Sequence, residues 1–245
     1  MKKLLLAAAV AGSLLASSAF AAVKSVVLVH GAFVDGSGWQ PVAQILEHDG
    51  YRVSVVQEPL TSLEEDVSAT NRVLDHAGPS VLVGHSWGGM IISDAGAHPN
   101  ARSLVYIAAF EPETGESAAA LQGKNPPAAQ SVIPVGGDFL AVDPAAFHND
   151  VAADLPEGAV HFSAISQVPI AGRSFGATVN APAWKAKPSY AVVATQDRMI
   201  NPELERFMSK RAKSETIELP GSHAVFISHP KEVAALIEKA ARNAN

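Results

Sequence analysis

The sequence contains no cysteine. A disulfide framework is therefore impossible, and so is lipid attachment through a cysteine at a cleavage site. Basic residues are also few, with 18 Lys and Arg against 24 Asp and Glu, which gives a formal charge of −6. This balance argues against nucleic acid as a partner. The acidic residues form no continuous block, which argues against a disordered acidic tail.

Only one long hydrophobic run is present, and it lies at the start of the chain. Two lysines at positions 2 and 3 precede an apolar stretch over residues 4–16 and a small-x-small site at residues 19–21. This pattern predicts a secretory signal peptide that is cleaved after Ala21. The apolar stretch is shorter than the roughly 20 residues that span a bilayer. We therefore expect an exported protein, periplasmic or secreted, with no stable membrane association after cleavage. Removal of the two lysines moves the formal charge from −6 to −8.

Six short apolar runs alternate with longer stretches of helical periodicity. Each run has the length of a strand, and its near-continuous apolarity indicates burial on both faces of a parallel sheet. The longer stretches begin with capping residues or proline, as helices do, and cover residues 39–48, 61–77, 202–212 and 231–241. We predict an α/β fold with a mostly parallel, doubly wound sheet of about six strands and helices on both faces. The predicted strands cover residues 25–29, 52–56, 80–84, 103–108, 189–194 and 215–219.

Residues 111–183 interrupt this alternation after the fourth strand. They contain eight prolines and many alanines, and we find no convincing buried strand among them. An irregular stretch of this length inside a compact domain is usually an insertion with a function. The dipeptide Asp143-Pro144 predicts one short capped helix within it. The predicted organisation is a signal peptide over residues 1–21, a core over residues 22–110 and 184–245, and the insertion over residues 111–183.

The pentapeptide Gly84-His85-Ser86-Trp87-Gly88 has the pattern G-x-S-x-G. It follows a predicted strand and precedes a helical pattern over residues 90–97, so Ser86 would occupy a sharp strand-to-helix turn. Side chains two residues before and after Ser86 would collide with the adjoining strand and helix, which explains the two glycines. Such a turn exposes the hydroxyl at the carboxyl end of the sheet. The sequence therefore predicts Ser86 as a nucleophile.

A nucleophilic serine needs a base, and the base needs a group that orients it. Asp197 follows the predicted strand over residues 189–194, and His223 follows the predicted strand over residues 215–219. Their order in the chain is serine, acid, histidine. We therefore predict Asp197 as the acid and His223 as the base.

Other residues compete for these roles. Glu111 comes just after a predicted strand and is an alternative acid, and His229 is an alternative base, although its place beside Pro230 suits the start of the last helix. His85 is expected to pack beneath the serine turn. The remaining histidines have no partners at metal-ligand spacing, so no metal site is predicted. They are His48, His76, His98, His148 and His161.

The loop after the first strand should supply one oxyanion donor. The dipeptide His30-Gly31 allows a tight turn over the nucleophile, which would direct the backbone N–H of Ala32 toward the oxyanion. The backbone N–H of Trp87 would be the second donor. We expect Phe33 to line the pocket, while Trp39 either anchors the start of a helix or lines the pocket.

Together these residues resemble the α/β-hydrolase superfamily, over residues 23–242. The stretches that match are VLVHGAF, GHSWGGM, ATQDRMINP and PGSHAVFISHP. The short sheet and single insertion are similar to the small branch that contains plant methyl esterases, hydroxynitrile lyases and many bacterial carboxylesterases. The resemblance implies that the insertion is a cap over the active site, and that no cofactor or metal is required.

Two departures from the lyases favour hydrolysis. Lyases of this branch carry a threonine at the position of Ala32 and a lysine at the position of Ala224, directly after the base. This sequence has neither. The resemblance therefore implies ester hydrolysis rather than cyanide chemistry.

The sequence thus predicts a serine hydrolase that cleaves small to medium neutral carboxylic esters through an acyl-enzyme. A lactonase, acting for example on acyl-homoserine lactones, is an alternative, and a non-catalytic small-molecule binding protein is a more distant one. An apolar pocket is expected for the ester or lactone. Its predicted substrate-binding residues are Phe33, Phe110, Phe139, Phe162 and Trp184, with Trp87, Phe147 and Phe175 as further aromatic candidates.

Overall fold

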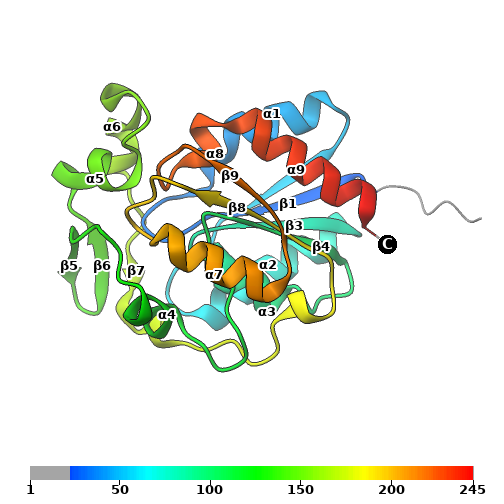
Figure 1. Ribbon diagram of the computed structural model, residues 1–245, viewed down its shortest axis with the longest axis horizontal. Helices are drawn as coiled ribbons and strands as arrows, with labels where there is room; N and C mark the ends of the chain where they lie inside the picture. Colours follow the sequence, from blue (N-terminus) through cyan, green and yellow to red (C-terminus); the bar gives the residue numbers. More distant parts are fainter. Residues whose placement is uncertain (1–22, 245) are drawn as a thin grey trace, which may run out of the picture.

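The computed structural model describes residues 23–244 of the 245-residue chain, so the predicted signal peptide lies outside the described residues. A six-stranded sheet forms the centre of the molecule (Figure 1). Its neighbouring strands all run parallel, in the order β2-β1-β3-β4-β8-β9. This order confirms the predicted parallel sheet. The strands are β1 (Ser25–Val29), β2 (Arg52–Val56), β3 (Ser80–His85), β4 (Ala101–Ile107), β8 (Ser189–Ala194) and β9 (Glu215–Leu219).

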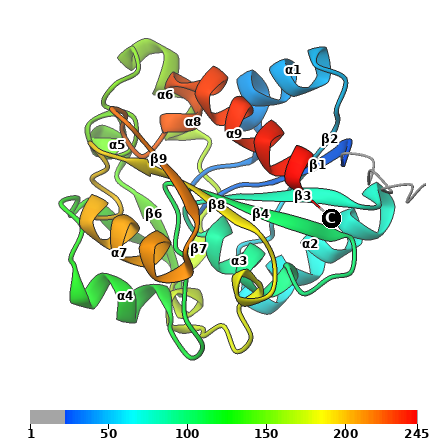
Figure 2. The ribbon, with the colours of Figure 1, turned by 45° about the vertical axis from the view of Figure 1, so that its right-hand side comes forward.

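Helices cover both faces of this sheet, so the fold is doubly wound as predicted (Figures 1 and 2). One layer contains α1 (Gln40–His48), α8 (Val225–Ser228) and α9 (Pro230–Asn243). The other contains α2 (Leu63–Ala77), α3 (Gly88–Ala95) and α7 (Pro202–Ala212). Within residues 23–244, no helix has the length and apolarity that crossing a membrane requires. Short 3-10 helices are η1 (Gly36–Trp39), η2 (Gly172–Gly176) and η3 (Ala183–Lys185).

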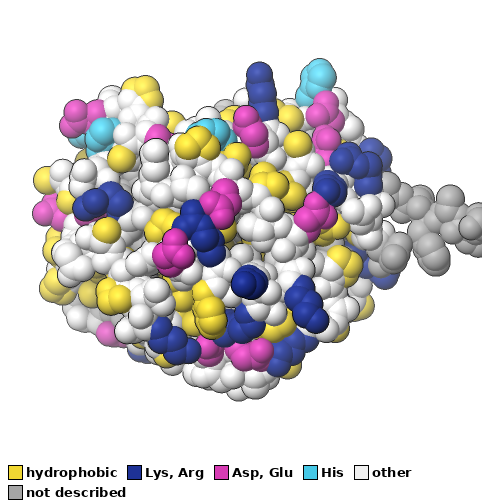
Figure 3. Space-filling view, viewed as in Figure 1, with side chains coloured by type: hydrophobic (Ala, Val, Ile, Leu, Met, Phe, Trp, Pro, Cys, Tyr) yellow, Lys and Arg dark blue, Asp and Glu magenta, His cyan; other side chains and the backbone are white. Residues whose placement is uncertain are grey.

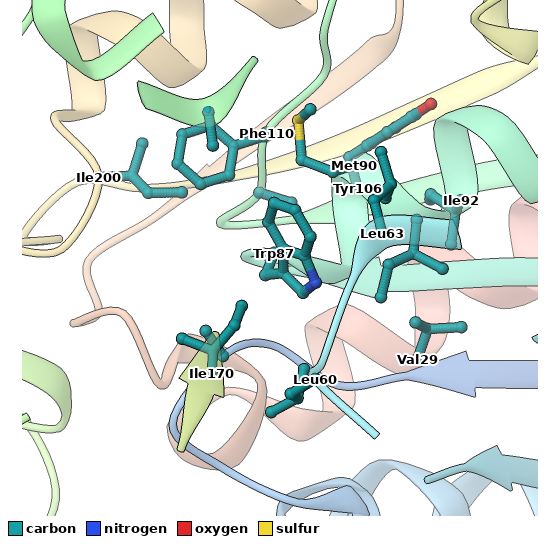
Figure 4. Close-up of a cluster of buried hydrophobic side chains, with 14 of the residues drawn as sticks. Val29, Leu60, Leu63, Trp87, Met90, Ile92, Tyr106, Phe110, Ile170 and Ile200 are labelled. Carbon is teal, nitrogen blue, oxygen red and sulfur yellow. The ribbon is translucent and has the colours of Figure 1, made fainter. Parts of the chain in front are cut away.

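The central strands are buried because alternate side chains enter two different hydrophobic cores. In β3, Leu82 belongs to the core beneath α2 and α3, whereas Val81 and Val83 belong to the core beneath α1 and α9. Figure 4 shows part of the first core, with the Trp87 ring at its centre. Burial on both faces explains why the strands are near-continuous apolar runs in the sequence.

Local sequence sets the limits of α2. The Ser62 side chain caps its first turn by accepting a hydrogen bond from the backbone N–H of Glu65. The first turn also contains three acidic residues, whose negative charge stabilises the helix by interacting with the positive end of its dipole. The helix ends at Gly78, whose φ of 72° suits glycine. Ser62 is therefore the residue that caps this helix.

The segment between β4 and β8 is more regular than predicted. It contains a three-stranded antiparallel sheet in the order β5-β6-β7, together with three helices. The expectation of an irregular insertion with one helix was wrong. The strands have five, four and two residues, and β5 is exposed throughout, so no buried apolar run marks them. The elements are α4 (Ala118–Lys124), β5 (Val132–Gly136), β6 (Phe139–Val142), α5 (Pro144–Val151), α6 (Glu157–Ile165) and β7 (Ile170–Ala171).

The single helix that was predicted in this segment is present as α5. The Asp143 side chain caps it by accepting a hydrogen bond from the backbone N–H of Ala145 at 3.0 Å, and Pro144 occupies the first turn. We call residues 111–183 the cap, because they lie together at one end of the central sheet (Figures 1 and 2). On the face shown in Figure 3, acidic and basic side chains are interspersed.

Candidate active site

Ser86 lies on the turn between β3 and α3, as the sequence predicted. Its φ is 54°, in the left-handed region that residues other than glycine seldom adopt. Hydrogen bonds hold the turn: the backbone carbonyl of Ser86 accepts from Gly89 N at 2.9 Å and from Phe110 N at 3.2 Å. A backbone conformation of this kind costs on the order of 1–3 kcal/mol and is found at functional sites. The strained turn therefore marks Ser86 as a functional candidate.

The glycines on both sides of Ser86 are required by close backbone approach. A Cβ at Gly84 would lie 2.5 Å from the carbonyl oxygen of Gly88, and a Cβ at Gly88 would lie 2.8 Å from that of Val29. This is the crowding that was predicted from the pattern. A third glycine was missed: a Cβ at Gly89 would lie 2.0 Å from the carbonyl oxygen of Phe110. The turn thus depends on glycines at three positions.

The structure joins the predicted acid and base directly. The Nδ1 of His223 lies 2.5 Å from Oδ2 of Asp197, and both side chains are buried. Because a carboxylate can only accept, Nδ1–H is the donor, and in the neutral imidazole Nε2 is then the nitrogen that can accept a proton. The other carboxylate oxygen of Asp197 accepts from Met199 N at 2.7 Å and from Ile200 N at 2.9 Å. These two backbone hydrogen bonds hold the carboxylate in the orientation in which its Oδ2 faces the imidazole.

Glu205, on α7, also lies beside Asp197 and was missed by sequence reasoning. Its Oε2 accepts a hydrogen bond from the backbone N–H of Ala194 at 3.0 Å. Burial, followed by the charge of Asp197, raises the pKa of Glu205 well above its usual value. The raised pKa favours the neutral form of Glu205 beside the Asp197 carboxylate. Nothing in its helical sequence context distinguishes it from a surface glutamate.

His85 supports the histidine loop from below. Its Nε2 donates to the backbone carbonyl of His223 at 2.9 Å, and the centroids of the His85 and His223 rings are 4.6 Å apart. Burial lowers the pKa of His85 well below its ordinary value, so the ring stays neutral. His229 lies at the start of α9, where its Nδ1 is 2.9 Å from Oγ of Ser228. The structure therefore places His223, and neither of these two, beside the acid.

Glu111, the alternative acid, points elsewhere. Its carboxyl accepts a hydrogen bond from Oγ of Ser214 at 2.5 Å, and its backbone carbonyl accepts from Arg211 at 2.9 Å. Burial raises the pKa of Glu111 to about 8, against the opposing effects of Ser214 and Arg211. Since the His223 ring bonds to Asp197, the geometry favours Asp197 as the acid.

Replacing Glu111 with glutamine should flatten the dependence of stability on pH. The pKa of Glu111 is about 8 in the folded protein against an ordinary value of 4.5. A raised folded-state pKa contributes stability that is complete below about pH 4.5 and is lost as the pH rises toward 8. Between pH 5 and pH 8 the loss is roughly 3–4 kcal/mol, from about 1.4 kcal/mol per unit of pKa. Urea unfolding of the wild type and of Glu111→Gln at both pH values measures it.

Glu47→Gln, a change at an exposed position of α1, is the matched control and should track the wild type. Parallel pH profiles for the wild type and Glu111→Gln would contradict a buried neutral carboxyl at this position.

A buried pair of side chains, His30 and Glu58, holds the loop that carries Ala32. Nε2 of His30 lies 2.5 Å from Oε2 of Glu58, and Nδ1 of His30 donates to the backbone carbonyl of Gly31 at 2.8 Å. Burial opposes charge on His30, but the hydrogen bond with Glu58 outweighs this effect and raises the pKa of His30. Burial raises the pKa of Glu58 as well, so the proton is shared within the pair. The loop also passes close to Ser86, since a Cβ at Gly31 would lie 2.8 Å from the Cβ of Ser86.

The two predicted oxyanion donors flank Ser86. Ala32 lines the same cavity as Ser86, and Trp87 follows Ser86 at the start of α3. Among residues 23–244, no backbone carbonyl accepts a hydrogen bond from the N–H of either residue. The Trp87 ring turns away from the cavity, and its Nε1 donates to Oδ2 of the buried Asp66 at 2.9 Å. That bond fixes the residue whose backbone N–H is the candidate donor.

Ser86 and His223 open onto one cavity of about 420 Å³. Its wall comes from the loops at the end of the sheet and from the cap. Within residues 23–244 no cluster of three His, Asp or Glu side chains is placed to hold a metal ion. Beside Ser86 and His223, the wall is formed by Ala32, Phe33, Phe110, Ala119, Gln122, Pro127, Ala129, Gln130, Val132, Leu140, Phe175, Met199 and Ile200.

The predicted pocket aromatics are only partly correct. Phe33, Phe110 and Phe175 line the cavity. Phe162 does not, because it lies on the outer face of α6 with 72% of its surface exposed. Phe139 pairs with Ala171 inside the cap sheet, and Nε1 of Trp184 donates to the backbone carbonyl of Pro112 at 2.7 Å.

Three further expectations about aromatic residues are settled by packing. Trp87 is fully buried in the core. Phe147, on α5, is absent from the wall of this cavity and instead lines a second pocket, together with Ala224 and Phe226. Trp39 is fully buried against Phe226, so it anchors the start of α1 and does not line the pocket.

The wall residues that the sequence did not reveal are mainly unremarkable apolar side chains. Met199 and Ile200 lie two and three residues after the predicted acid, and this position on a loop after a strand was a usable signal. Leu140, Gln122 and Gln130 belong to the cap, where only the folded chain brings them to the cavity.

Comparison with known proteins supports the same fold. A model of the alpha/beta hydrolase family matches residues 26–236. A carbendazim hydrolyzing esterase from Nocardioides sp. (strain SG-4G) is 36% identical over 130 residues, which cover 47% of this chain and 54% of that protein. The match thus spans about half the length of this curated relative.

Two solved structures share the architecture over nearly their whole length. A pyrethroid hydrolase from Sphingobium faniae JZ-2 has a TM-score of 0.76 at 24% identity, over 89% of this chain and 97% of the other. Polyneuridine aldehyde esterase has a TM-score of 0.78 at 16% identity, over 89% and 98%. Because the family model covers most of the sequence, this chain belongs to the alpha/beta hydrolase family.

Proposed function

We propose that this protein is a serine esterase that hydrolyses small to medium neutral carboxylic esters. The observation that carries the proposal is the buried hydrogen bond between His223 and Asp197, 2.5 Å long, at the cavity that Ser86 also lines. The names of its relatives support the reaction class, since the curated relative is a carbendazim hydrolyzing esterase and one structural neighbour is a pyrethroid hydrolase.

The proposed reaction proceeds in two acyl-transfer steps. Nε2 of His223 takes the hydroxyl proton as Oγ of Ser86 attacks the ester carbonyl carbon. The carbonyl oxygen becomes an oxyanion, which accepts hydrogen bonds from the backbone N–H groups of Ala32 and Trp87. The ester C–O bond then breaks, and the alcohol leaves with the proton from His223.

Water completes the cycle by the same route. His223 removes a proton from water as the water oxygen attacks the acyl carbon, and the carboxylic acid leaves as Ser86 recovers its proton. Asp197 stays ionised throughout and stabilises the imidazolium of His223. Its two backbone hydrogen bonds keep it in the orientation that this role requires.

The cavity determines the proposed substrate class. Its volume of about 420 Å³ lies at the lower end of the usual range for small-molecule sites. The side chains around the reacting groups are apolar apart from Gln122 and Gln130, neither of which is charged. A neutral ester loses little hydration free energy when it enters a cavity with such a lining, whereas a phosphorylated or charged ester would lose much more.

Hydrolysis of 4-nitrophenyl acetate and butyrate, with product analysis on γ-lactones and acyl-homoserine lactones, tests the proposal. We expect turnover of both linear esters and covalent labelling of Ser86 by a fluorophosphonate probe. Exclusive opening of lactones would replace the esterase proposal by a lactonase. An unlabelled Ser86 in folded protein would instead favour a non-catalytic binding protein.

A further inference from the structure

The loop that carries His223 is bonded to the cap on both sides of the imidazole. The backbone N–H of Ala224 donates to the carbonyl of Val151 at 2.9 Å. Oγ of Ser222 lies 2.5 Å from Oδ1 of Asp154 and 3.1 Å from the same Val151 carbonyl. Val151 ends α5 and Asp154 follows it, so one short piece of the cap contacts both neighbours of His223.

The loop that carries Asp197 is bonded to the cap as well. Nε of Arg198 donates to Oδ1 of Asp150 at 2.9 Å, and the carboxyl of Asp150 is 7% exposed. The backbone carbonyl of Arg198 accepts from Ala129 N at 2.8 Å. The backbone carbonyl of Met199 accepts from Nε2 of Gln122 at 3.0 Å. Asp150 and Asp154 therefore contact the acid loop and the base loop, respectively, from the same end of α5.

The fit between the base loop and the cap is close. A Cβ at Gly221 would lie 2.7 Å from Cγ2 of Val225 and 3.0 Å from Oδ2 of Asp154, so a side chain here would crowd both residues. On the opposite side, His85 donates to the carbonyl of His223 from the core. The imidazole loop is thus held between a bond from the core and bonds from the cap. Burial opposes charge on Asp154, but its hydrogen bonds with Ser222 outweigh that effect and lower the pKa of Asp154.

We propose that residues 150–154 of the cap are a positioning element for the acid and the base, with Asp154 and Asp150 as its positioning residues. The proposal deepens the proposed esterase function and rests on it. The cap then positions the acid and the base, in addition to forming part of the substrate cavity. Movement of the end of α5 away from the core would release Ser222 and Arg198 together, so the His223–Asp197 pair keeps its geometry only while the cap is seated.

Asp154→Ala should lower kcat for 4-nitrophenyl butyrate by about 10- to 100-fold, the effect of a misplacement of about 1 Å. KM should change little, because Asp154 does not line the cavity. Asp154→Asn should recover most of kcat, since its amide oxygen still accepts from Ser222. Asp138→Ala is the matched control: this cap carboxylate is exposed, pairs with Arg173, and contacts neither loop.

A second measurement needs no substrate. The Nδ1–H proton of His223, hydrogen-bonded to Asp197, should give a downfield NMR signal that exchanges slowly with water in the wild type and in Asp138→Ala. In Asp154→Ala it should broaden or exchange faster. If Asp154→Ala fails to fold, Ser222→Ala removes the same bond from the other partner, with the same expectation.

An unchanged kcat or an unchanged NMR signal in the folded variants overturns the positioning role. If the wild type hydrolyses no ester, the proposed function is wrong, and the NMR signal alone then decides whether the cap holds the imidazole.

Discussion

Ser86→Ala should lower kcat for 4-nitrophenyl butyrate by on the order of 10⁴- to 10⁶-fold. In the proposed mechanism, the substitution removes the oxygen that attacks the ester and leaves His223 without the proton it accepts. The backbone should keep its shape, because the three glycines at positions 84, 88 and 89 and the hydrogen bonds to the carbonyl of residue 86 do not depend on the hydroxyl. What remains is the contribution of the oxyanion donors and of binding. Steady-state kinetics with stopped-flow detection of 4-nitrophenol measures the loss.

Ser80→Ala is the matched control for this prediction. Ser80 begins the same strand, β3, at the end remote from the cavity, and its hydroxyl donates to the carbonyl of Gly78 at 2.7 Å. Its kcat should equal that of the wild type. Turnover by Ser86→Ala within tenfold of the wild type would reject Ser86 as the nucleophile. Retained binding of a non-hydrolysable ester analogue would show that the cavity is intact.

Asp197→Asn should lower kcat by on the order of 10⁴-fold. The Asn carbonyl can still accept from the backbone N–H groups of Met199 and Ile200, so its NH₂ group would face Nδ1 of His223. Nδ1 would then have to accept, which moves the ring proton to Nε2, the nitrogen that must take the proton from Ser86. The variant should fold as the wild type does and bind substrate with little change in KM.

Glu111→Gln separates the two acids that the sequence left open. Glu111 bonds to Ser214, remote from the imidazole, so this variant should keep the kcat of the wild type at pH 7. A large loss of activity in Glu111→Gln together with a small one in Asp197→Asn would reverse the assignment. The comparison uses substitutions of the same kind, carboxyl to amide, at two buried sites.

The fold and the three residues of the candidate site were accessible to sequence reasoning because both depend on local patterns with long-range consequences. Strands buried on two faces, such as β3, leave continuous apolar runs, and loops after such strands meet at one edge of the sheet. Ser86, Asp197 and His223 each directly follow a strand or lie within a few residues of its end. Their encounter therefore follows from topology without knowledge of any side-chain contact.

The cap and the cavity wall were less accessible for a physical reason. Contacts between residues far apart in the sequence decide which of their side chains line the cavity, and the local periodicity of the sequence does not. Phe162 is exposed although it is aromatic and apolar, whereas Gln122 and Gln130 reach the cavity although they are polar. Glu205 has the helical surroundings of a surface residue, and only the packing of α7 against β8 places it behind Asp197.

The outer strand of the cap sheet shows how an apolar edge strand can remain exposed without pairing with strands of other molecules. β5 carries the exposed side chains of Val132, Ile133 and Val135, and it pairs with β6 on one side. Pro134 interrupts its row of N–H donors, and the pairing shifts register between Pro134 and Gly136. A neighbouring molecule that approached this edge would meet a broken ladder, which makes β5 a poor template for intermolecular β-pairing and aggregation.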